Sequence, residues 1–339
     1  MNEITNIGII GTGRIGTHHA KNIEYNIPEA SVVALMDLDN SKAKNLAHEF
    51  SNCMTYTRAE HLIAAPNVDA ILIAAPDELH SELLFQCLES NKPVLCEKPI
   101  ATSSTSAKSI VHKEMELGIR LIQIGFMREY DPAHSKVKMI CDNGDLGRIF
   151  TFRSFSSQTI GLDQHSQGNR EIKDLIVNSM IHDFHSARWF MNQEVRKLYV
   201  SSISDDGPNT ARFLIVTAEF QDGSLGLIEY NDNSGFGYTV DIKITGELGS
   251  IESSSLSDPI KYSSNSKSQS ITNDWLERFD SAYLIELRNW VKSIQDKIPS
   301  GPNAWDGYMS LRIAEACIKS VETAKFIDIP YIPKPNFYE

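Results

Sequence analysis

Short apolar segments alternate with amphipathic segments over roughly the first third of the chain. Segments that are apolar throughout are typical of parallel strands covered on both faces, and the stretches between them are long enough for crossover helices. The apolar segments are Ile4–Ile10, Val32–Met36, Ala70–Ala75, Val94–Cys96 and Leu121–Ile124. After the third of them, residues 77–91 begin with a favourable N-cap and place Leu79, Leu83, Leu84 and Leu88 on one helical stripe. This pattern predicts a parallel sheet with crossover helices.

Beyond Gly125 the pattern becomes typical of an antiparallel sheet. A helix that carries Val137 and Ile140 on one side precedes a strand over Ile149–Phe155 and a helix over Ile176–Met191. Four further strands at hairpin spacing are predicted over Tyr199–Ser204, Ala211–Phe220, Ser224–Asn231 and Tyr238–Thr245. Two helices, over 274–296 and 304–325, close the chain. We therefore expect a mostly antiparallel sheet with helices on one face.

The change of pattern divides the chain into two predicted α/β domains. The first, over 1–124, has a parallel sheet, and the second, over 125–339, has a mostly antiparallel open sheet. Within the second domain, residues 252–273 contain nine serines and form either a flexible insertion or a solvent-facing hairpin. We favour the hairpin because Ile260, Tyr262 and Ile271 interrupt the polar sequence.

Composition and charge narrow the possible partners and the compartment. A formal net charge of -12 over 339 residues repels nucleic acid and anionic membrane surfaces, so we expect neither as a partner. The five cysteines are widely spaced and form no C-x-x-C pair, which indicates neither a disulfide framework nor a zinc cluster. No apolar run approaches the roughly 20 residues that span a bilayer, and the N-terminus has no secretory pattern. We expect a cytoplasmic protein.

A glycine-rich turn follows the first predicted strand and opens a helix. In Gly11-Thr12-Gly13-Arg14-Ile15-Gly16, the first glycine permits a tight turn, the second lets the backbone approach a pyrophosphate, and the third allows close packing of helix on strand. Asp37 ends the second strand, where its carboxylate can accept hydrogen bonds from ribose hydroxyls. The following Leu38-Asp39-Asn40 offers no arginine for a 2'-phosphate. These residues predict a Rossmann domain that prefers NAD to NADP.

A second candidate motif, Cys96-Glu97-Lys98-Pro99, lies at the end of the predicted strand Val94–Cys96. Open parallel sheets hold ligands at the carboxyl ends of their strands, so Lys98 would face a bound substrate. Its ammonium group can donate to a hydroxyl, and a depressed pKa would let it join in proton transfer.

The motifs together resemble the glucose-fructose oxidoreductase, inositol dehydrogenase and rhizopine catabolism (Gfo/Idh/MocA) family, and within it the inositol 2-dehydrogenases. The resemblance covers nearly the whole chain. It is carried by Gly11–Gly16, Asp37, Ala75–His80, Glu97–Pro99, Gly125–Pro132, Ile181–Phe184, Arg188–Trp189, Gly237–Tyr238, Gly246–Gly249, Arg278–Tyr283 and Asp306–Gly307.

The resemblance implies roles for individual residues. Lys98 would be the active-site lysine, and His182 would take the hydroxyl proton while hydride leaves the same carbon for the nicotinamide. His80 would pack or form a hydrogen bond beside the nicotinamide. The implied cofactor-binding set is Gly11, Thr12, Gly13, Arg14, Ile15, Gly16, Asp37, Leu38, Ala75, Pro76, His80, Glu97 and Lys98. The implied substrate-binding set is Lys98, Arg128, Asn178, His182, Tyr238 and Tyr283.

Two positions depart from the family pattern. Asn178 and His185 stand where family members commonly have aspartates, four residues before and three after His182. Asn178 can orient a hydroxyl but cannot stabilise an imidazolium by charge. The expected consequence is slower chemistry, a different substrate, or a compensating carboxylate such as Asp183 or Asp163. His182 and His185 could also form half of a metal site; because no further ligands complete it, we expect no metal. The loop over 156–170 is expected to help select the substrate.

The sequence therefore favours an NAD-dependent dehydrogenase that oxidises a secondary alcohol of a cyclic polyol, myo- or scyllo-inositol, with Lys98, Asn178 and His182 in catalysis. One alternative is a pyranose or sugar-derivative dehydrogenase of the same family. Another is a sugar sensor that binds NAD without turnover, although retention of Lys98 and His182 argues against it. The free face of the second sheet and the family resemblance predict a homo-oligomer, a dimer or tetramer.

Overall fold

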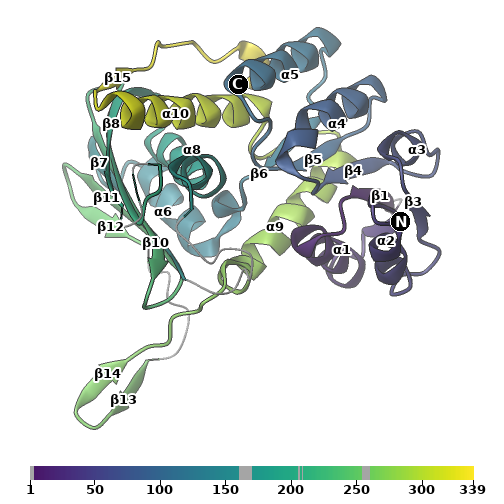
Figure 1. The fold of residues 1–339 in the computed structure, drawn as a ribbon, viewed down its shortest axis with the longest axis horizontal. Coiled ribbons are helices and arrows are strands. Elements are labelled where there is room, and N and C mark those ends of the chain that lie inside the picture. The colour runs from purple at the N-terminus through teal and green to yellow at the C-terminus, as the bar shows by residue number, and fades with distance from the viewer. Residues whose placement is uncertain (1–3, 160–169, 205–206, 208, 254–259) are drawn as a thin grey trace. The chain divides into compact units, whose positions relative to one another are not determined.

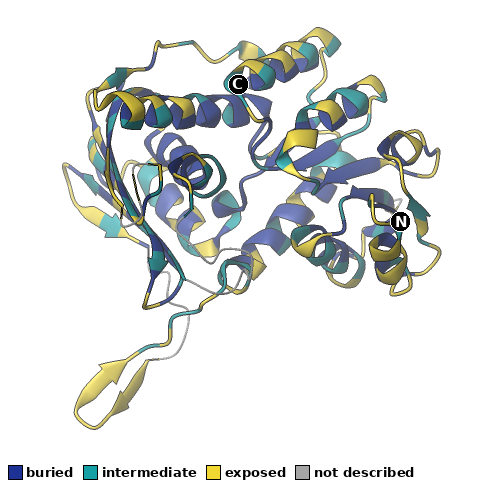
Figure 2. Cartoon of the chain, in the orientation of Figure 1, coloured by how far each residue is buried: buried dark blue, intermediate teal, exposed yellow. Residues whose placement is uncertain are grey.

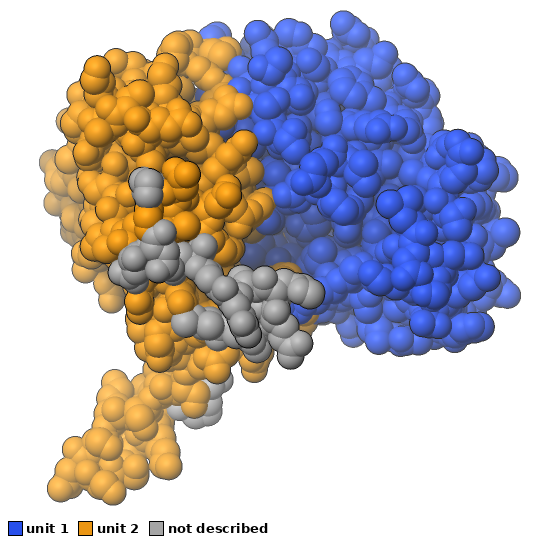
Figure 3. Space-filling model, in the orientation of Figure 1, with its two compact units in different colours: residues 1–127, 281–311, 333–339 blue, residues 128–280, 312–332 orange. Residues whose placement is uncertain are grey.

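The structure is a computed structural model that describes residues 4–159, 170–204, 207, 209–253 and 260–339. The chain divides into two compact units, which are coloured separately in Figure 3. Unit 1 comprises residues 1–127, 281–311 and 333–339, and unit 2 comprises residues 128–280 and 312–332. Each unit is built around its own sheet.

Unit 1 contains a six-stranded parallel sheet in the order β3-β2-β1-β4-β5-β6 (Figure 1). Its strands are β1 (Thr5–Ile10), β2 (Ala30–Met36), β3 (Met54–Tyr56), β4 (Ala70–Ile73), β5 (Val94–Glu97) and β6 (Ile122–Gly125). Its crossover helices are α1 (Arg14–Asn26), α2 (Asn40–Ala47), α3 (Ala59–Ile63), α4 (Asp77–Glu89) and α5 (Ser104–Leu117). Every residue of β4, β5 and β6 is buried (Figure 2), as expected for strands with helices on both faces. The predicted parallel α/β sheet is confirmed.

Helix α4 differs in two details from the prediction. Its N-cap is Pro76, and Asp77 is its first helical residue rather than its capping residue. Leu83, Leu84 and Leu88 are buried as predicted, but Leu79 is 37% exposed and does not share their stripe. Asp77 still suits the first turn, because its negative charge interacts favourably with the helix dipole.

Unit 2 contains a seven-stranded, mostly antiparallel sheet in the order β12-β11-β7-β10-β9-β8-β15. The strands are β7 (Ile149–Thr159), β8 (Val195–Ile203), β9 (Phe213–Phe220), β10 (Leu225–Ser234), β11 (Thr239–Gly246), β12 (Ser250–Glu252) and β15 (Ile327–Asp328). Only the β7–β10 pair among them is parallel. Along β9 and β10 buried residues alternate with partly buried or exposed ones, so a single face of the sheet carries the core. The mixed α/β class of the chain is confirmed.

Three helices supply the other half of this core. They are α6 (Pro132–Asp142), α8 (Ile181–Met191) and α10 (Ala304–Thr323). Val137 of α6, Phe184 of α8 and Cys317 of α10 belong to one buried cluster with residues of the sheet.

The predicted helix over 176–191 is interrupted. A short α7 (Ile172–Asp174) leads into a π-helical segment, η2 (Leu175–Ser179), and α8 begins only at Ile181. A π turn changes the direction in which successive side chains point, and such turns are frequent at functional sites. This segment carries Asn178, and the first turn of α8 carries His182.

The serine-rich segment forms a hairpin where it is described. Strands β13 (Lys261–Ser263) and β14 (Ser266–Ser268) pair with each other and with no other strand of the described chain. All six of their residues are exposed (Figure 2). The favoured hairpin is thus confirmed for residues 261–268.

The C-terminal third contributes to both units. Helix α9 (Trp275–Asp296) has non-helical angles at Phe279, and the boundary between the units follows at Asp280. Beyond it, Leu287, Trp290 and Val291 pack into the core of the parallel sheet. The sequence division placed all of 125–339 in one domain. It could not separate these residues, because an amphipathic helix does not reveal which sheet it covers. A 3-10 helix, η3 (Asn336–Tyr338), ends the chain.

Candidate active site

The glycine loop lies between β1 and α1, with the geometry that a bound pyrophosphate requires. Gly11 has φ of +97°, and a Cβ there would lie 2.3 Å from the Ala74 carbonyl oxygen. A Cβ on Gly16 would lie 2.0 Å from the Gly11 carbonyl oxygen, whereas one on Gly13 would meet nothing within 4 Å. Gly13 is also the N-cap of α1, and no side chain caps this helix. The open space and the uncapped N–H groups together fit a phosphate anion.

Asp37 follows β2 and reaches back to the glycine loop. Its Oδ2 accepts hydrogen bonds from the Thr12 backbone N–H at 2.9 Å and from the Thr12 hydroxyl at 2.8 Å. Burial raises the pKa of Asp37, but the bonds from Thr12 and from the Asp39 N–H outweigh it and hold the pKa below its usual value. Asp37 is therefore an ionised acceptor beside the loop, as ribose binding requires. Leu38, next in sequence, is 76% exposed.

His80 contacts both the loop after β4 and the loop after β5. This buried histidine lies in the first turns of α4, with Nδ1 2.7 Å from the Pro99 carbonyl oxygen and Nε2 2.9 Å from that of Ala75. Parallel strands present their carboxyl ends at one edge, so Ala75, Pro76 and Lys98 share the edge that carries the glycine loop. The implied cofactor residues thus gather within unit 1.

Glu97 is more deeply buried than the adjacent Lys98. Lys98 is partly exposed, whereas Glu97 is 7% exposed at the end of β5. Glu97 Oε1 lies 2.8 Å from Nε2 of His19, a fully buried residue of α1. Burial raises the pKa of Glu97, yet this hydrogen bond and nearby positive charge keep it below its usual value. No pattern in the sequence indicated His19, because its partner lies 78 residues away.

The second group of predicted residues lies in unit 2 on the segment around η2. His182 is in the first turn of α8 and is 9% exposed. The Asn178 side-chain amide donates to Asp174 Oδ1, one turn earlier, at 2.5 Å. Asp174 therefore supplies the carboxylate beside Asn178, a residue that the i, i+4 spacing could have indicated. Of the other expected candidates, Asp183 is engaged with Arg128, Ser154 and Ser156. Asp163 lies outside the described residues, as does most of the loop over 156–170.

Asp183 is the centre of a buried network with Arg128. Its Oδ1 accepts from Arg128 Nη1 at 2.8 Å and from the hydroxyls of Ser154 and Ser156 at 2.5 and 2.9 Å. Burial lowers the pKa of Arg128, but Asp183 and Tyr238 more than offset this effect and raise it. Burial raises the pKa of Tyr238, so its hydroxyl stays protonated at neutral pH. Arg128 and Tyr238 are thus fixed donors within unit 2.

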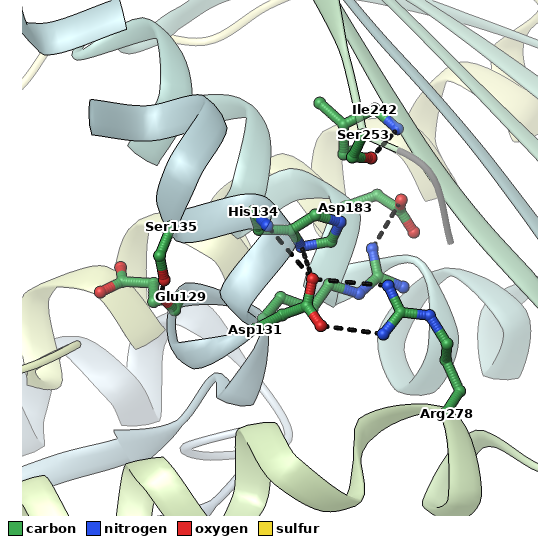
Figure 4. A network of polar contacts seen from close by, with 9 residues as sticks. Glu129, Asp131, His134, Ser135, Asp183, Ile242, Ser253 and Arg278 are labelled. Carbon is green, nitrogen blue, oxygen red and sulfur yellow. Dashed lines mark hydrogen bonds and ion pairs between the residues drawn. The ribbon is translucent and has the colours of Figure 1, made fainter. Parts of the chain in front are cut away.

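A second buried network surrounds Asp131, which caps α6 (Figure 4). Arg278 Nη1 donates to Asp131 Oδ1 at 2.8 Å, and the His134 backbone N–H donates to Oδ2 at 3.2 Å. Although burial raises the pKa of Asp131, these partners lower it overall. His185, which stands where family members commonly have an aspartate, has its Nε2 2.7 Å from Glu129 Oε1. Glu129 therefore provides a carboxylate beside this position.

Tyr283 belongs to unit 1 and is 4% exposed. Its ring meets those of His18 and His19 edge-on, with centroids 5.7 and 5.5 Å apart. It thereby contacts α1, the helix that begins at the glycine loop.

Other features of the described chain bear on cofactor chemistry. All five cysteines are free thiols. Among the described residues, no group of three or more His, Cys, Asp or Glu is placed to hold a metal ion. No helix in these ranges combines the length and hydropathy needed to cross a membrane.

Known proteins resemble this chain along almost its whole length. It is 37% identical over 342 residues to an inositol 2-dehydrogenase of Rubrobacter xylanophilus, with 98% of this chain and 95% of that protein covered. An inositol 2-dehydrogenase of Klebsiella pneumoniae is 33% identical, with 98% of each chain covered. The solved structure of myo-inositol dehydrogenase from Lactobacillus casei, in complex with NAD(H) and myo-inositol, has a TM-score of 0.93 at 25% identity, covering 99% and 100% of the two chains.

Two family models match consecutive parts of the chain. The model described as oxidoreductase family, NAD-binding Rossmann fold, matches residues 5–126. The model described as oxidoreductase family, C-terminal alpha/beta domain, matches residues 138–329. Together with the glycine loop and Asp37, these matches show that the chain belongs to the Gfo/Idh/MocA family of NAD-binding oxidoreductases and resembles its inositol dehydrogenases.

Proposed function

We propose that this protein oxidises a secondary hydroxyl of an inositol to the ketone, with NAD as the hydride acceptor. The observation that carries the proposal is the placement of Lys98 after β5, at the same sheet edge as the uncapped glycine loop and the ionised Asp37. An ammonium donor beside a dinucleotide site suits a substrate that offers a hydroxyl. The named relatives act on inositols, which supports the choice of substrate.

The cofactor-binding roles divide between backbone and side chains. Gly11–Gly16 and the N-terminus of α1 would hold the pyrophosphate, and Asp37 would accept hydrogen bonds from the ribose hydroxyls. The absence of acidic residues from the first turn of α1 suits an anion. When bound there, NAD supplies the electrophilic ring carbon that accepts the hydride.

The chain's own residues handle the proton and the orientation of the substrate. Lys98 donates a hydrogen bond to the reacting hydroxyl, and Asn178 orients it. His182 removes the hydroxyl proton as the C–H bond breaks and the C=O bond forms. A histidine suits this step because its ordinary pKa lies near 6.5, so it can accept a proton at neutral pH. Arg128 and Tyr238 would donate to the remaining hydroxyls of the ring.

Absorbance at 340 nm tests the proposal directly. With NAD and myo- or scyllo-inositol, the wild-type protein should produce reduced cofactor faster than with glucose. His182→Gln should lower kcat by about 100-fold or more, because a general base contributes 10²–10⁴-fold. The matched control, His112→Gln, replaces an exposed histidine of α5 and should leave kcat unchanged. Full turnover by His182→Gln would refute the role of His182.

The same substrate panel separates the alternatives. Faster turnover of glucose than of either inositol would favour a sugar dehydrogenase, in which Asn178 marks a changed pocket. NAD binding without reduction by any substrate would favour a sensor.

A further inference from the structure

Two buried histidines hold the residues on either side of Lys98. His19 of α1 forms a hydrogen bond with the Glu97 carboxylate. His80 of α4 lies within hydrogen-bond distance of the Pro99 carbonyl oxygen. Both histidines are 0% exposed. Glu97, Lys98 and Pro99 are consecutive, so the lysine lies between two anchored neighbours. All of these contacts lie within unit 1.

The contact before Lys98 leaves the Glu97 side chain little freedom. Its Oε1 is fixed by His19 Nε2 at 2.8 Å, and its Oε2 accepts the Lys98 backbone N–H at 3.3 Å. Gly125 of the neighbouring strand β6 leaves room for the carboxylate, because a Cβ there would lie 3.0 Å from Oε2. Tyr283 meets the His19 ring edge-on and fixes its orientation. The carboxylate thus links His19 to the Lys98 main chain.

After Lys98, the Pro99 carbonyl oxygen contacts His80, which also contacts Ala75 in the loop after β4. His80 Nδ1 lies 2.7 Å from the Pro99 oxygen, and its Nε2 lies 2.9 Å from the Ala75 oxygen. Both partners are carbonyl oxygens, which only accept, so a neutral ring with its single N–H donates to one of them and packs against the other. Rotation of this buried ring would lose that hydrogen bond, which is costly. The ring therefore restricts movement of the loops after β4 and β5.

Packing alone does not account for these side chains. Apolar residues of similar volume would fill the same space without the cost of burying polar groups. Although His19 Nδ1 has no hydrogen-bond partner among the described residues, its buried hydrogen bond to Glu97 restricts local geometry. Functional groups need support of this kind to keep a productive orientation.

We propose that His19 and His80 are positioning residues that fix the main chain around Lys98 and so aim its ammonium group. The inference rests on the proposed function, in which Lys98 donates to the substrate hydroxyl. His19 acts through Glu97 and His80 acts through Pro99.

Steady-state kinetics and hydrogen exchange of the full chain test this proposal. His19→Leu and His80→Leu should each lower kcat by at least tenfold, while KM for NAD changes less than threefold. His19→Gln retains a donor and should recover most of kcat. If His19→Leu does not fold, Glu97→Gln replaces it in the test. This variant keeps the packing, weakens the His19–Glu97 hydrogen bond, and should likewise lower kcat. His112→Gln on the exposed face of α5 is the control.

Hydrogen–deuterium exchange provides a readout that does not depend on turnover. The peptide that contains the Lys98 amide should exchange at least fivefold faster in His19→Leu and His80→Leu than in wild type, with peptides of β1 and β2 unchanged. If wild type reduces no NAD but the exchange still depends on the histidines, the proposed function fails and the positioning role stands. If wild type turns over and the variants keep both kcat and protection, the positioning role is wrong.

Discussion

Individual buried polar groups set the chemistry of this protein through their partners. Asp131, Asp183 and Glu97 are each buried carboxylates, and each meets a cationic or hydrogen-bonding group from a distant part of the sequence. His134 differs from these carboxylates, since neither of its ring nitrogens has a hydrogen-bond partner among the described residues. Burial lowers the pKa of His134 to about 4 despite the nearby Asp131.

The pKa of His134 predicts a loss of stability in mild acid. In the unfolded chain this histidine titrates near 6.5. Between pH 6.5 and about pH 4, this histidine therefore binds a proton in the unfolded chain but not in the folded chain, and the folded state loses stability as the pH falls. The free energy of unfolding should fall by about 2 kcal/mol between pH 7 and pH 5. The lowered pKa of Asp131 does not add to this change, because its contribution is lost only below its ordinary pKa of 3.8.

Urea unfolding at the two pH values measures the effect. His134→Leu removes the titrating group and should flatten the pH dependence by about the same 2 kcal/mol. The exposed His61 provides a matched control, His61→Gln, which should retain the wild-type slope. An unchanged slope in His134→Leu would contradict the assignment.

Asp37 should determine the choice of cofactor. Asp37→Ser removes the charged acceptor for the ribose hydroxyls, and a hydrogen bond to a charged group contributes about 1.5–3 kcal/mol. We expect KM for NAD to rise by about tenfold or more, and the preference over NADP to weaken. Asp39→Ser, which keeps a capping side chain on α2, should preserve both values. Equal kinetics for Asp37→Ser and wild type would rule out this role.

At the scale of elements, the segment that leads into α8 has the least regular geometry near the proposed site. The change from α7 through η2 to α8 sets the directions of Asn178 and His182, and Asp174 holds Asn178 across one turn. Asn178 stands where family members commonly carry a carboxylate. With Asp174 in contact, a second carboxylate there would face a like charge.

This arrangement predicts the effect of restoring the family residue. Asn178→Asp alone should lower the free energy of unfolding by about 1 kcal/mol, because a hydrogen bond is lost and repulsion is introduced. Asp174→Asn combined with Asn178→Asp reverses the pair and should recover most of that loss. Chemical denaturation of the four proteins in the cycle measures the coupling. Additive effects would show that the two residues do not interact.

The sequence predicted those elements whose pattern is local. Five of the six parallel strands are mainly apolar runs, and the glycine loop follows one of them directly, so these features were evident. Strand β3 was not predicted, because Met54-Thr55-Tyr56 is too short to show such a run. The π turn was not, because its residues fit an ordinary helical stripe. The contacts of His19 with Glu97 and of Arg128 with Asp183 join residues 78 and 55 positions apart, and no spacing rule links them.

At the scale of the whole molecule, the less buried face of the seven-stranded sheet, opposite its helices, predicts self-association. Ile215 and Leu227 lie on this face, together with ion pairs such as Arg153–Glu229. A face that combines apolar residues with paired charges suits a two-fold interface. Light scattering should give a mass two or four times 38.0 kDa. Leu227→Glu should reduce this mass, whereas Ile119→Glu, at an exposed site in unit 1, should not. A monomeric wild type would contradict the expectation.

The composition of unit 1 from three separated segments has a consequence for synthesis. Trp290 completes the core around β1 and β2, and the Tyr338 hydroxyl donates to the buried Glu114 at 2.7 Å. A ribosome synthesises these residues after most of unit 2. The nascent nucleotide-binding half therefore keeps part of its apolar surface uncovered until they emerge, whereas most of unit 2 is complete earlier. Chaperone demand should peak in that interval.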